Sequence, residues 1–377
     1  MRICILSMQD VQNMGSLLQS YALKEMLTQM DLEVGFLPIE SRDKDNLLIQ
    51  NWVEDFREEA EHIDGVSRLK KIDKYLFIRL KNSLLRKKQF EIYDRFREKY
   101  FASPSLSQFL IYDYCVIGSD EVFNCSNKTK WGFTSQLFGN VKEAKHIITY
   151  AASCGFTTAK KIPVEVAECI RNAMSNLDAV SVRDKNTKEF VKELTGKDAC
   201  VHLDPVLVYD FKDEIDRSVS VEGLPQSYCV IYSYDNRIHA KSEIESINNF
   251  CREHNMTPIC VGIPQFWIKD YIVADPFQCL KIFQNAKFVI TDTFHGTIFS
   301  VKYCKRFATI VRGSNKNKLQ DLIDRIQISN HQISKISSLE LDRAFDVVHD
   351  KKRFDSFIER ERARSKSYLT KNIKKEI

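Results

Sequence analysis

The sequence predicts an α/β protein with two doubly wound domains, and three observations support this prediction. Short apolar segments alternate along the chain with segments of helical apolar spacing, as in parallel sheets whose crossovers are helices. The alternation restarts after a charged connection, and 377 residues is a suitable length for two such domains. Polar clusters follow the predicted strands, which is where open α/β sheets bind their ligands.

The first domain is predicted to hold five strands. Residues 3–6 form the first, and a polar turn at Asn13, Gly15 and Ser16 leads into a helix over residues 17–30. The backbone N–H groups of this turn can hold an anion or a sugar, although the turn matches neither common phosphate-binding motif. The other strands are predicted at residues 33–37, 112–117, 146–151 and 179–182. We therefore expect the turn and the later strand ends to share one edge of a sheet.

Residues 51–100 differ from the rest of this domain. The segment is helical in period and rich in Lys and Arg between Arg68 and Lys99. Its apolar residues can form one stripe: Leu69, Ile72, Tyr75, Leu76, Leu80, Leu84 and Phe90. Such a stripe either faces a membrane or an anionic substrate, or packs on its own domain as a helical insertion. The second interpretation is favoured, because such stripes usually pack internally.

The second half repeats the architecture after a charged connection at residues 210–226. Strands are predicted at residues 228–232, 258–261, 287–290 and 307–311, and helices at 240–254 and 276–285. The predicted domains are therefore residues 1–215, with the basic insertion near 51–100, and residues 216–345. Residues 346–377 are predicted to form a charged C-terminal helical segment.

The strand at 287–290 leads into the most informative stretch of the chain, which reads TDTFHGT. A strand that ends in polar residues and turns into a helix makes an anion site, because free N–H groups and the helix dipole point at one place. His295 can donate there to a phosphate or carboxylate and can transfer protons near neutral pH. Asp292 can orient its imidazole, and Thr293 and Thr297 can donate to an anion. Helix capping is the alternative for these three residues.

Four other polar residues stand at strand ends. Arg183 can bind phosphate or carboxylate in bidentate fashion, with a salt bridge to Asp184 or another local acid as the alternative. Asp120 is a candidate base or hydroxyl-binding carboxylate, and turn chemistry explains it equally well. Arg312 is expected on the same side as His295, where the two can clamp a doubly charged anion. Asp204 precedes a proline and fits a turn between the domains.

Composition excludes several classes of function. A net charge of +5 suits a protein that handles anionic substrates, and no RNA-binding motif or zinc-finger spacing appears, so no nucleic-acid partner is expected. The 11 cysteines form no C-x-x-C pair, which favours a reduced cytoplasmic chain with buried thiols and without a metal site. The start, MRICILSM, lacks signal-peptide features, and no stretch reaches the roughly 18 apolar residues that span a bilayer.

Five motifs, taken together and in order, resemble the polysaccharide pyruvyl transferase family. They read N-x-G-S-x-x-Q-x-Y-A-L from Asn13, G-S-D-E-V-F-N from Gly118, S-V-R-D from Ser181, L-D-P from Leu203 and T-D-T-F-H-G-T from Thr291. Each motif alone is weak, whereas the combination is fairly specific. The resemblance runs to about Ile326 and excludes the insertion at 51–100.

The resemblance implies two Rossmann-like domains in a GT-B-like arrangement with a cleft between them. It implies transfer of a pyruvyl group from phosphoenolpyruvate onto two sugar hydroxyls as a cyclic ketal, in exopolysaccharide biosynthesis. It implies no metal and no cofactor beyond phosphoenolpyruvate as a co-substrate.

The family pattern also assigns residues. In the family, an arginine and the histidine of the F/L-H-G segment bind phosphoenolpyruvate and support catalysis, and Arg183 and His295 match them here. Phe294 and Gly296 of the same segment join the expected substrate-binding set. Some members carry an arginine before the Phe/Leu-His pair, where this chain has Thr293, and Arg312 is the candidate substitute.

The hypothesis for the chemistry follows from these assignments. His295 protonates the enolpyruvyl methylene carbon or stabilises the phosphate as that proton arrives. Arg183 and Arg312 hold the carboxylate and the phosphate. Asp120 or Asp292 accepts a hydroxyl proton from the sugar.

Two alternative functions stay open. A GT-B-type glycosyltransferase would need groups in the second domain that bind a base and a ribose, and none is recognisable. A non-catalytic sugar-binding protein would keep the fold, and Thr293 leaves room for that interpretation. The expected partners are phosphoenolpyruvate and a saccharide acceptor. A lipid-linked acceptor, peripheral contact with the inner face of the membrane and the oligomeric state are left open.

Overall fold

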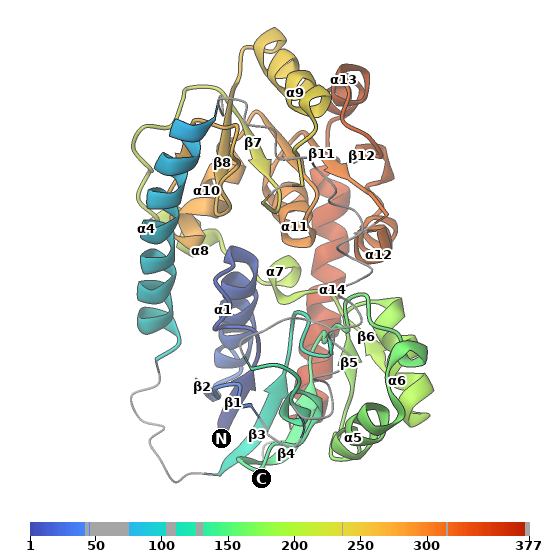
Figure 1. Ribbon diagram of the computed structural model, residues 1–377. Helices are drawn as coiled ribbons and strands as arrows, with labels where there is room; N and C mark the ends of the chain where they lie inside the picture. Colours follow the sequence, from blue (N-terminus) through green and yellow to red (C-terminus); the bar gives the residue numbers. More distant parts are fainter. Residues whose placement is uncertain are drawn as a thin grey trace.

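The computed structural model describes residues 1–41, 45, 75–102, 111–125, 131–235, 237–313 and 316–373, and it places them in two α/β halves (Figure 1). The half drawn at the bottom of Figure 1 is built on a parallel sheet of order β2-β1-β3-β4. The half at the top is built on a parallel sheet of order β12-β11-β10-β7-β8-β9. The predicted fold class, two doubly wound units in a GT-B-like arrangement, is confirmed.

The N-terminal half contains two sheets and six α-helices among the described residues. The strands are β1 (Arg2–Leu6), β2 (Glu33–Phe36), β3 (Tyr112–Ile117), β4 (Ala144–Thr149), and the paired β5 (Ser181–Val182) and β6 (Cys200–Val201). The helices are α1 (Met14–Thr28), α4 (Leu76–Tyr100), α5 (Val164–Met174), α6 (Lys185–Thr195), α7 (Pro205–Val208) and α8 (Lys212–Arg217). Short 3₁₀ turns are η1 (Ser135–Phe138) and η2 (Ala159–Lys161).

The C-terminal half adds six strands. They are β7 (Tyr228–Tyr232), β8 (Thr257–Val261), β9 (Asp270–Ile272), β10 (Phe288–Thr291), β11 (Phe307–Ile310) and β12 (Gln332–Ile333). Its helical elements are α9 (Lys241–Glu253), α10 (Pro276–Asn285), α11 (Phe294–Tyr303), α12 (Lys316–Ile326), η3 (Ser329–His331), α13 (Ser338–Asp346) and α14 (Lys351–Asn372). The division of the chain at residues 215 and 345 stays a prediction.

Local sequence accounts for many of these boundaries. Helix α10 begins at a capping box in which the Asp275 side chain accepts from the N–H of Gln278 while the Gln278 side chain binds back, and Pro276 fills the first helical position. Helix α6 ends at Gly196, whose φ of 71° is a left-handed conformation that glycine adopts readily. The helix predicted from residue 17 begins earlier, at Met14, so Gly15 and Ser16 lie in its first turn.

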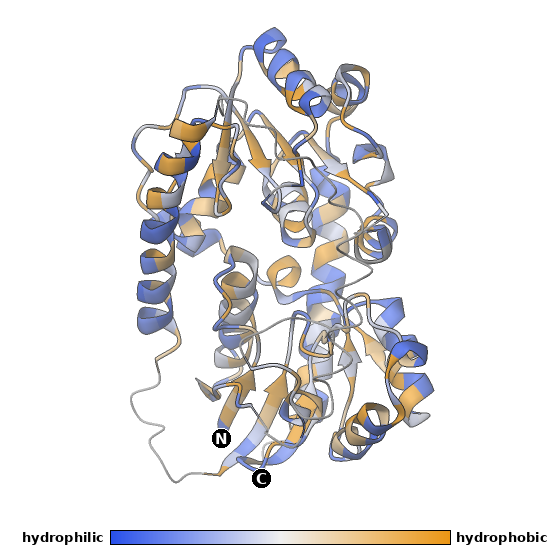
Figure 2. Ribbon diagram, viewed as in Figure 1, coloured by the Kyte–Doolittle hydropathy of each residue, from blue (hydrophilic) through white to orange (hydrophobic). Residues whose placement is uncertain are grey.

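One hydrophobic core cluster contains residues of both halves. Tyr21 of α1, Phe96 of α4 and Phe277 of α10 lie in the same buried cluster, and their rings contact one another across the halves. Figure 2 shows most strands of the two large sheets in the colours of hydrophobic residues. Helix α14 spans both halves, because Phe354 packs in this shared cluster while Tyr368 packs under the N-terminal sheet (Figure 1). The halves therefore meet through a packed interface.

Of the predicted helical insertion near residues 51–100, residues 51–74 lie outside the described part of the chain. Helix α4 accounts for the rest. Its side chains Tyr93 and Phe96 are buried in the shared core, whereas Leu76, Leu80 and Leu84 face outward. Of the described members of the predicted apolar stripe, Tyr75 and Phe90 pack against core clusters, so only part of the stripe packs internally as expected.

Candidate active site

The first turns of α1 and α11 touch each other where the two halves meet. Gly15 of α1 packs so closely on His295 of α11 that an added Cβ would lie 2.2 Å from His295 Nδ1. Carbon and nitrogen atoms that are not bonded rarely approach below about 3.4 Å, so a larger residue fits here only if the His295 ring or α1 moves. The structure thus places the predicted polar turn of the first domain against the predicted histidine of the second.

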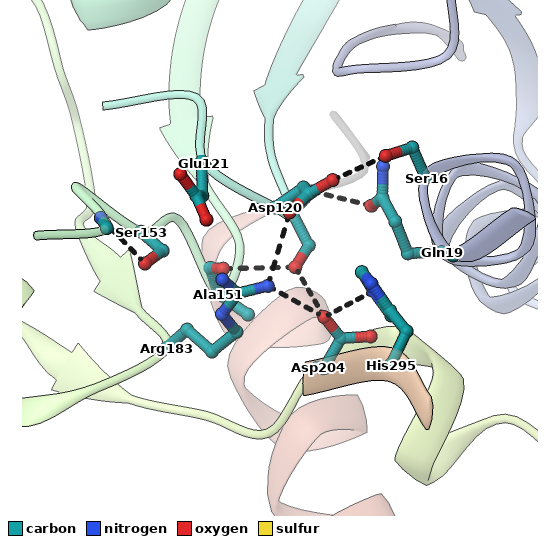
Figure 3. A network of polar contacts seen from close by, with 12 residues as sticks. Ser16, Gln19, Asp120, Glu121, Ala151, Ser153, Arg183, Asp204 and His295 are labelled. Carbon is teal, nitrogen blue, oxygen red and sulfur yellow. Dashed lines mark hydrogen bonds and ion pairs between the residues drawn. The ribbon is translucent and has the colours of Figure 1, made fainter. Parts of the chain in front are cut away.

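Asp204 lies at the centre of the polar network in Figure 3. Its Oδ1 accepts from the Val206 N–H at 3.0 Å and so caps α7. Its Oδ2 accepts from Arg183 Nη1 at 3.1 Å and lies 3.6 Å from His295 Nε2. Ser119 Oγ lies 3.4 Å from the same oxygen. Burial alone would raise the pKa of this carboxyl group, but His295 and Arg183 outweigh burial and lower the pKa to about 2. Asp204 is therefore ionised at neutral pH.

Arg183 is buried and holds two carboxylates. Besides Asp204, its Nη1 lies 3.5 Å from Asp120 Oδ1. Burial would lower the pKa of the guanidinium, but the charges of Asp120 and Asp204 outweigh burial and raise it. Phe294 of the other half covers the group, with its ring centre 4.1 Å from the guanidinium carbon. The single positive charge of Arg183 is thus shared between two negative ones.

Asp120 connects this network to α1. Its Oδ2 accepts a hydrogen bond of 2.7 Å from Ser16 Oγ, as Figure 3 shows. Its φ of 68° is a left-handed conformation, which is uncommon for residues other than glycine and recurs at functional sites. Gln19 supports the same loop, because its Oε1 accepts from the Ser119 N–H at 3.1 Å.

The C-terminal half contributes a further buried carboxyl group. Asp292, which follows β10, is 1% exposed, and its Oδ2 lies 3.6 Å from Arg237 Nη1. Burial raises the pKa of Asp292, and the Arg237 charge opposes that rise only in part. The Arg237 guanidinium lies 4.6 Å from the centre of the Tyr234 ring.

Arg312 contacts the backbone of the loop that carries Arg237. Its Nη2 donates to Glu243 at 2.9 Å, and its Nη1 donates to the carbonyl oxygen of Arg237 at 3.1 Å. The Arg237 guanidinium lies 3.6 Å from Asp292, and the charge of Arg312 also acts to lower the pKa of Asp292. The proposed pairing of Arg312 with His295 around one anion stays a prediction.

Two of the predicted polar residues cap helices, and for Thr293 capping is the alternative that the sequence left open. Asn13 Oδ1 accepts from the Gly15 N–H at 2.8 Å, and Thr293 Oγ1 accepts from the Gly296 N–H at 2.9 Å. Thr297 Oγ1 donates to the Thr293 carbonyl at 2.9 Å. Gly296 is needed for space, since an added Cβ would lie 2.1 Å from Thr291 Oγ1. These residues shape the two helix starts that carry Ser16, Phe294 and His295.

Sequence reasoning left three residues out of the predicted site. Asp204 was assigned to a turn between the domains. An aspartate before a proline is an ordinary signal at a helix start, so it did not stand out as a site residue. Arg237 and Tyr234 lie beyond the end of β7, and only the rule that ligands bind beyond the carboxyl ends of strands could have suggested them. Within the described residues, no group of three or more His, Cys, Asp and Glu side chains could hold a metal ion.

The family model for polysaccharide pyruvyl transferase matches residues 13–314, which is more than half of the chain. The chain belongs to the polysaccharide pyruvyl transferase family. The match includes both helix starts, Asp120, Arg183, Asp204 and Arg237. No curated protein matches the sequence.

Solved structures of similar shape are UDP-N-acetylglucosamine 2-epimerases. The protein from Rickettsia bellii is 10% identical, with a TM-score of 0.47 and 99% of this chain and 98% of that chain covered. The protein from Neisseria meningitidis, bound to UDP-GlcNAc, is 8% identical, with a TM-score of 0.47 and 99% of each chain covered. The protein from Methanocaldococcus jannaschii, in complex with UDP-GlcNAc and UDP, is 10% identical, with a TM-score of 0.45 and 94% of each chain covered. Such distant similarity carries no argument about substrate.

All eleven cysteines are free thiols, and nine are buried. Among the described helices, none combines the length and apolar character needed to cross a membrane.

Proposed function

We propose that the protein transfers the pyruvyl group of phosphoenolpyruvate onto two hydroxyls of a sugar in a polysaccharide or its precursor. The observation that carries the proposal is the meeting of His295 with Asp204 and Arg183 across the two halves. Family membership supports the transferase class. For the proposed reaction, His295 can serve as the proton donor, Asp204 as its negative counter-charge and Arg183 as a cation. No cofactor is needed beyond phosphoenolpyruvate itself.

The proposed reaction begins with proton transfer from His295 to the methylene carbon of phosphoenolpyruvate. Positive charge then develops at the neighbouring carbon, and a sugar hydroxyl attacks it and loses its proton. The bond from this carbon to the phosphate oxygen breaks, and a second hydroxyl closes the ketal ring. Of the two protons that the hydroxyls lose, one replaces the proton donated by His295 and the other leaves with phosphate.

Asp204 fits the role of a positioning residue in this scheme. Its ionised carboxylate, 3.6 Å from Nε2, can balance a positive charge on His295 and fix the ring. That distance is longer than a hydrogen bond, and such contacts often tighten only when substrate binds. Asp120 fits the role of the base that accepts a hydroxyl proton, because its carboxylate faces the start of α1 and bonds a hydroxyl group already, that of Ser16.

The charge balance of the site indicates how the donor anion binds. Arg183 already faces two carboxylates, so alone it offers little net positive charge to phosphoenolpyruvate. We therefore assign a second cation, Arg237, to the donor anion. It lies beside Asp292, the residue just before Thr293, and its side chain is 34% exposed. Because Thr293 stands where some relatives carry arginine, Arg237 supplies the missing charge from a neighbouring loop.

The acceptor and the location belong to the same proposal. A saccharide acceptor follows from family membership, and a lipid-linked precursor would place the reaction at the inner face of the membrane. The cytoplasm is the compartment that supplies phosphoenolpyruvate and keeps thiols reduced, which suits a chain with eleven free cysteines.

The test is a reaction of the purified protein with phosphoenolpyruvate and polysaccharide isolated from a host strain that lacks it. We expect phosphate release that requires the acceptor, and a new ketal methyl signal in the NMR spectrum of the product. Hydrolysis of a UDP sugar without consumption of phosphoenolpyruvate would instead assign a glycosyltransferase. Absence of phosphoenolpyruvate binding in calorimetry, with or without acceptor, would favour a non-catalytic sugar-binding relative.

A further inference from the structure

The first half of α4 exposes a row of large apolar side chains. Leu76, Phe77, Leu80 and Leu84 have exposed fractions of 56%, 79%, 60% and 64%. Their spacing of three and four residues puts them on one face of the helix. Single exposed apolar residues are normal on protein surfaces, whereas a continuous row marks an interaction surface. We call these four residues the α4 apolar row.

Contacts on the opposite face fix the direction of this row. Asn82 Nδ2 donates to the carbonyl oxygens of Gln265 at 3.1 Å and Ile268 at 3.3 Å. Further along the helix, Gln89 donates to the carbonyl of Ala274 at 2.7 Å and accepts from its N–H at 3.1 Å. Both side chains are buried, so rotation of α4 about its axis would break buried hydrogen bonds. Figure 1 shows α4 along the side of the molecule.

Basic residues of the same helix accompany the α4 apolar row, and one of them, Arg86, pairs with Asp235 of the C-terminal half at 3.7 Å. Residues 76–90 contain no Asp or Glu, and their Lys and Arg residues are Arg79, Lys81, Arg86, Lys87 and Lys88. Lys87 and Lys88 are exposed and continue the face of Leu80 and Leu84 by one turn. For a chain whose whole net charge is +5, this concentration of charge is marked. An apolar row with basic neighbours is the pattern of helices that lie in a membrane interface.

We propose that the first half of α4 binds the surface of an anionic phospholipid bilayer, with the α4 apolar row inserted among the lipid headgroups. The charge favours this occupant over a second copy of the chain. A two-fold dimer formed through this face would bring the same basic residues of both copies together, and like charges repel. The inference does not depend on the proposed function, since it rests on this helix alone.

The test is sedimentation of the purified full chain with vesicles of phosphatidylcholine alone or mixed with phosphatidylglycerol. We expect binding to the mixed vesicles that weakens as salt is added. Replacing both Leu80 and Leu84 by serine should reduce this binding on the order of 30-fold, given the apolar area withdrawn from lipid. K87Q/K88Q should reduce it about 25-fold, at about fivefold for each lysine. Leu339 and Val348, which are 78% and 57% exposed in the C-terminal half, provide the matched control pair L339S/V348S.

The outcomes decide the proposal. All replaced residues are exposed, and thermal unfolding of each variant verifies that its fold is retained. The proposal would be overturned if the wild-type protein did not bind the mixed vesicles. Equal binding by L80S/L84S and L339S/V348S would also overturn it. Light scattering that shows a dimer in the wild type, and a monomer in L80S/L84S, would assign this face to a second copy and also overturn it.

Discussion

A methyl group added at Gly15 tests whether the two helix starts meet as described. In Gly15→Ala, the new Cβ would lie 2.2 Å from His295 Nδ1, 2.3 Å from its Cγ and 2.7 Å from its Cβ. Restoring ordinary contact distances requires a displacement on the order of 1 Å of the ring or of α1. Overpacking of this kind costs about 1–3 kcal/mol. Alanine is better than glycine inside a helix by about 1 kcal/mol, so the expected net loss in the free energy of unfolding is about 1 kcal/mol.

A double-mutant cycle isolates the contact. In a His295→Ala background the ring is gone, so Gly15→Ala should cost nothing or should stabilise the protein. The expected coupling between the two sites is about 1–2 kcal/mol, measured from urea unfolding of the four proteins. Gly313→Ala is the control, because no atom lies within 4 Å of an added Cβ at that position. An equal cost of Gly15→Ala in both backgrounds would refute the packing of α1 on His295.

Three further predictions concern the site. His295→Ala should lower kcat by about 10²–10⁴-fold, as expected for loss of a general acid, and near-normal turnover would contradict the proposed role. The folded-state pKa of Asp204, about 2, lies below its ordinary value of 3.8, so its stabilising effect is complete above pH 3.8 and is lost as the pH falls toward 2. The effect is about 2 kcal/mol. The unfolding free energies of wild type and Asp204→Asn should therefore converge as the pH falls from 3.8 to about 2, whereas parallel curves would show that Asp204 carries no such shift. Arg237→Gln should raise KM for phosphoenolpyruvate about tenfold or more with a smaller change in kcat, while Arg360→Gln on the exposed side of α14 leaves both unchanged. An unaltered KM in Arg237→Gln would place the donor anion elsewhere.

The strand ends of the site could be read from the sequence because they depend on local pattern. Apolar runs followed by polar residues predicted that Asp120, Arg183 and His295 each lie just beyond the end of a strand. The structure brings all three residues into one polar network. Parallel sheets guarantee this gathering within a half, since their carboxyl ends share an edge.

The parts that could not be predicted depend on distant partners. The role of Asp204 is set by Arg183 and by His295 of the other half, and neither contact leaves a local signal in the sequence. Arg237 lies in a loop, and its relation to Asp292 depends on how the neighbouring strands β7 and β10 pair. Conversely, the capping interpretation of Thr293 was available from the sequence, because caps are formed by residues close in the chain.

Helix α14 has a consequence for how the chain is made. Tyr368 donates to the Thr149 carbonyl at 2.9 Å, and the Tyr150 hydroxyl lies 2.8 Å from Ser365 Oγ, so the last helix covers the sheet that is built first. During synthesis, the N-terminal strands leave the ribosome long before this cover exists. Until then, Ile3 and Ile5 lack their contact with Leu369, which lies in the same buried cluster. The N-terminal half can complete its packing only after α14 has been synthesised.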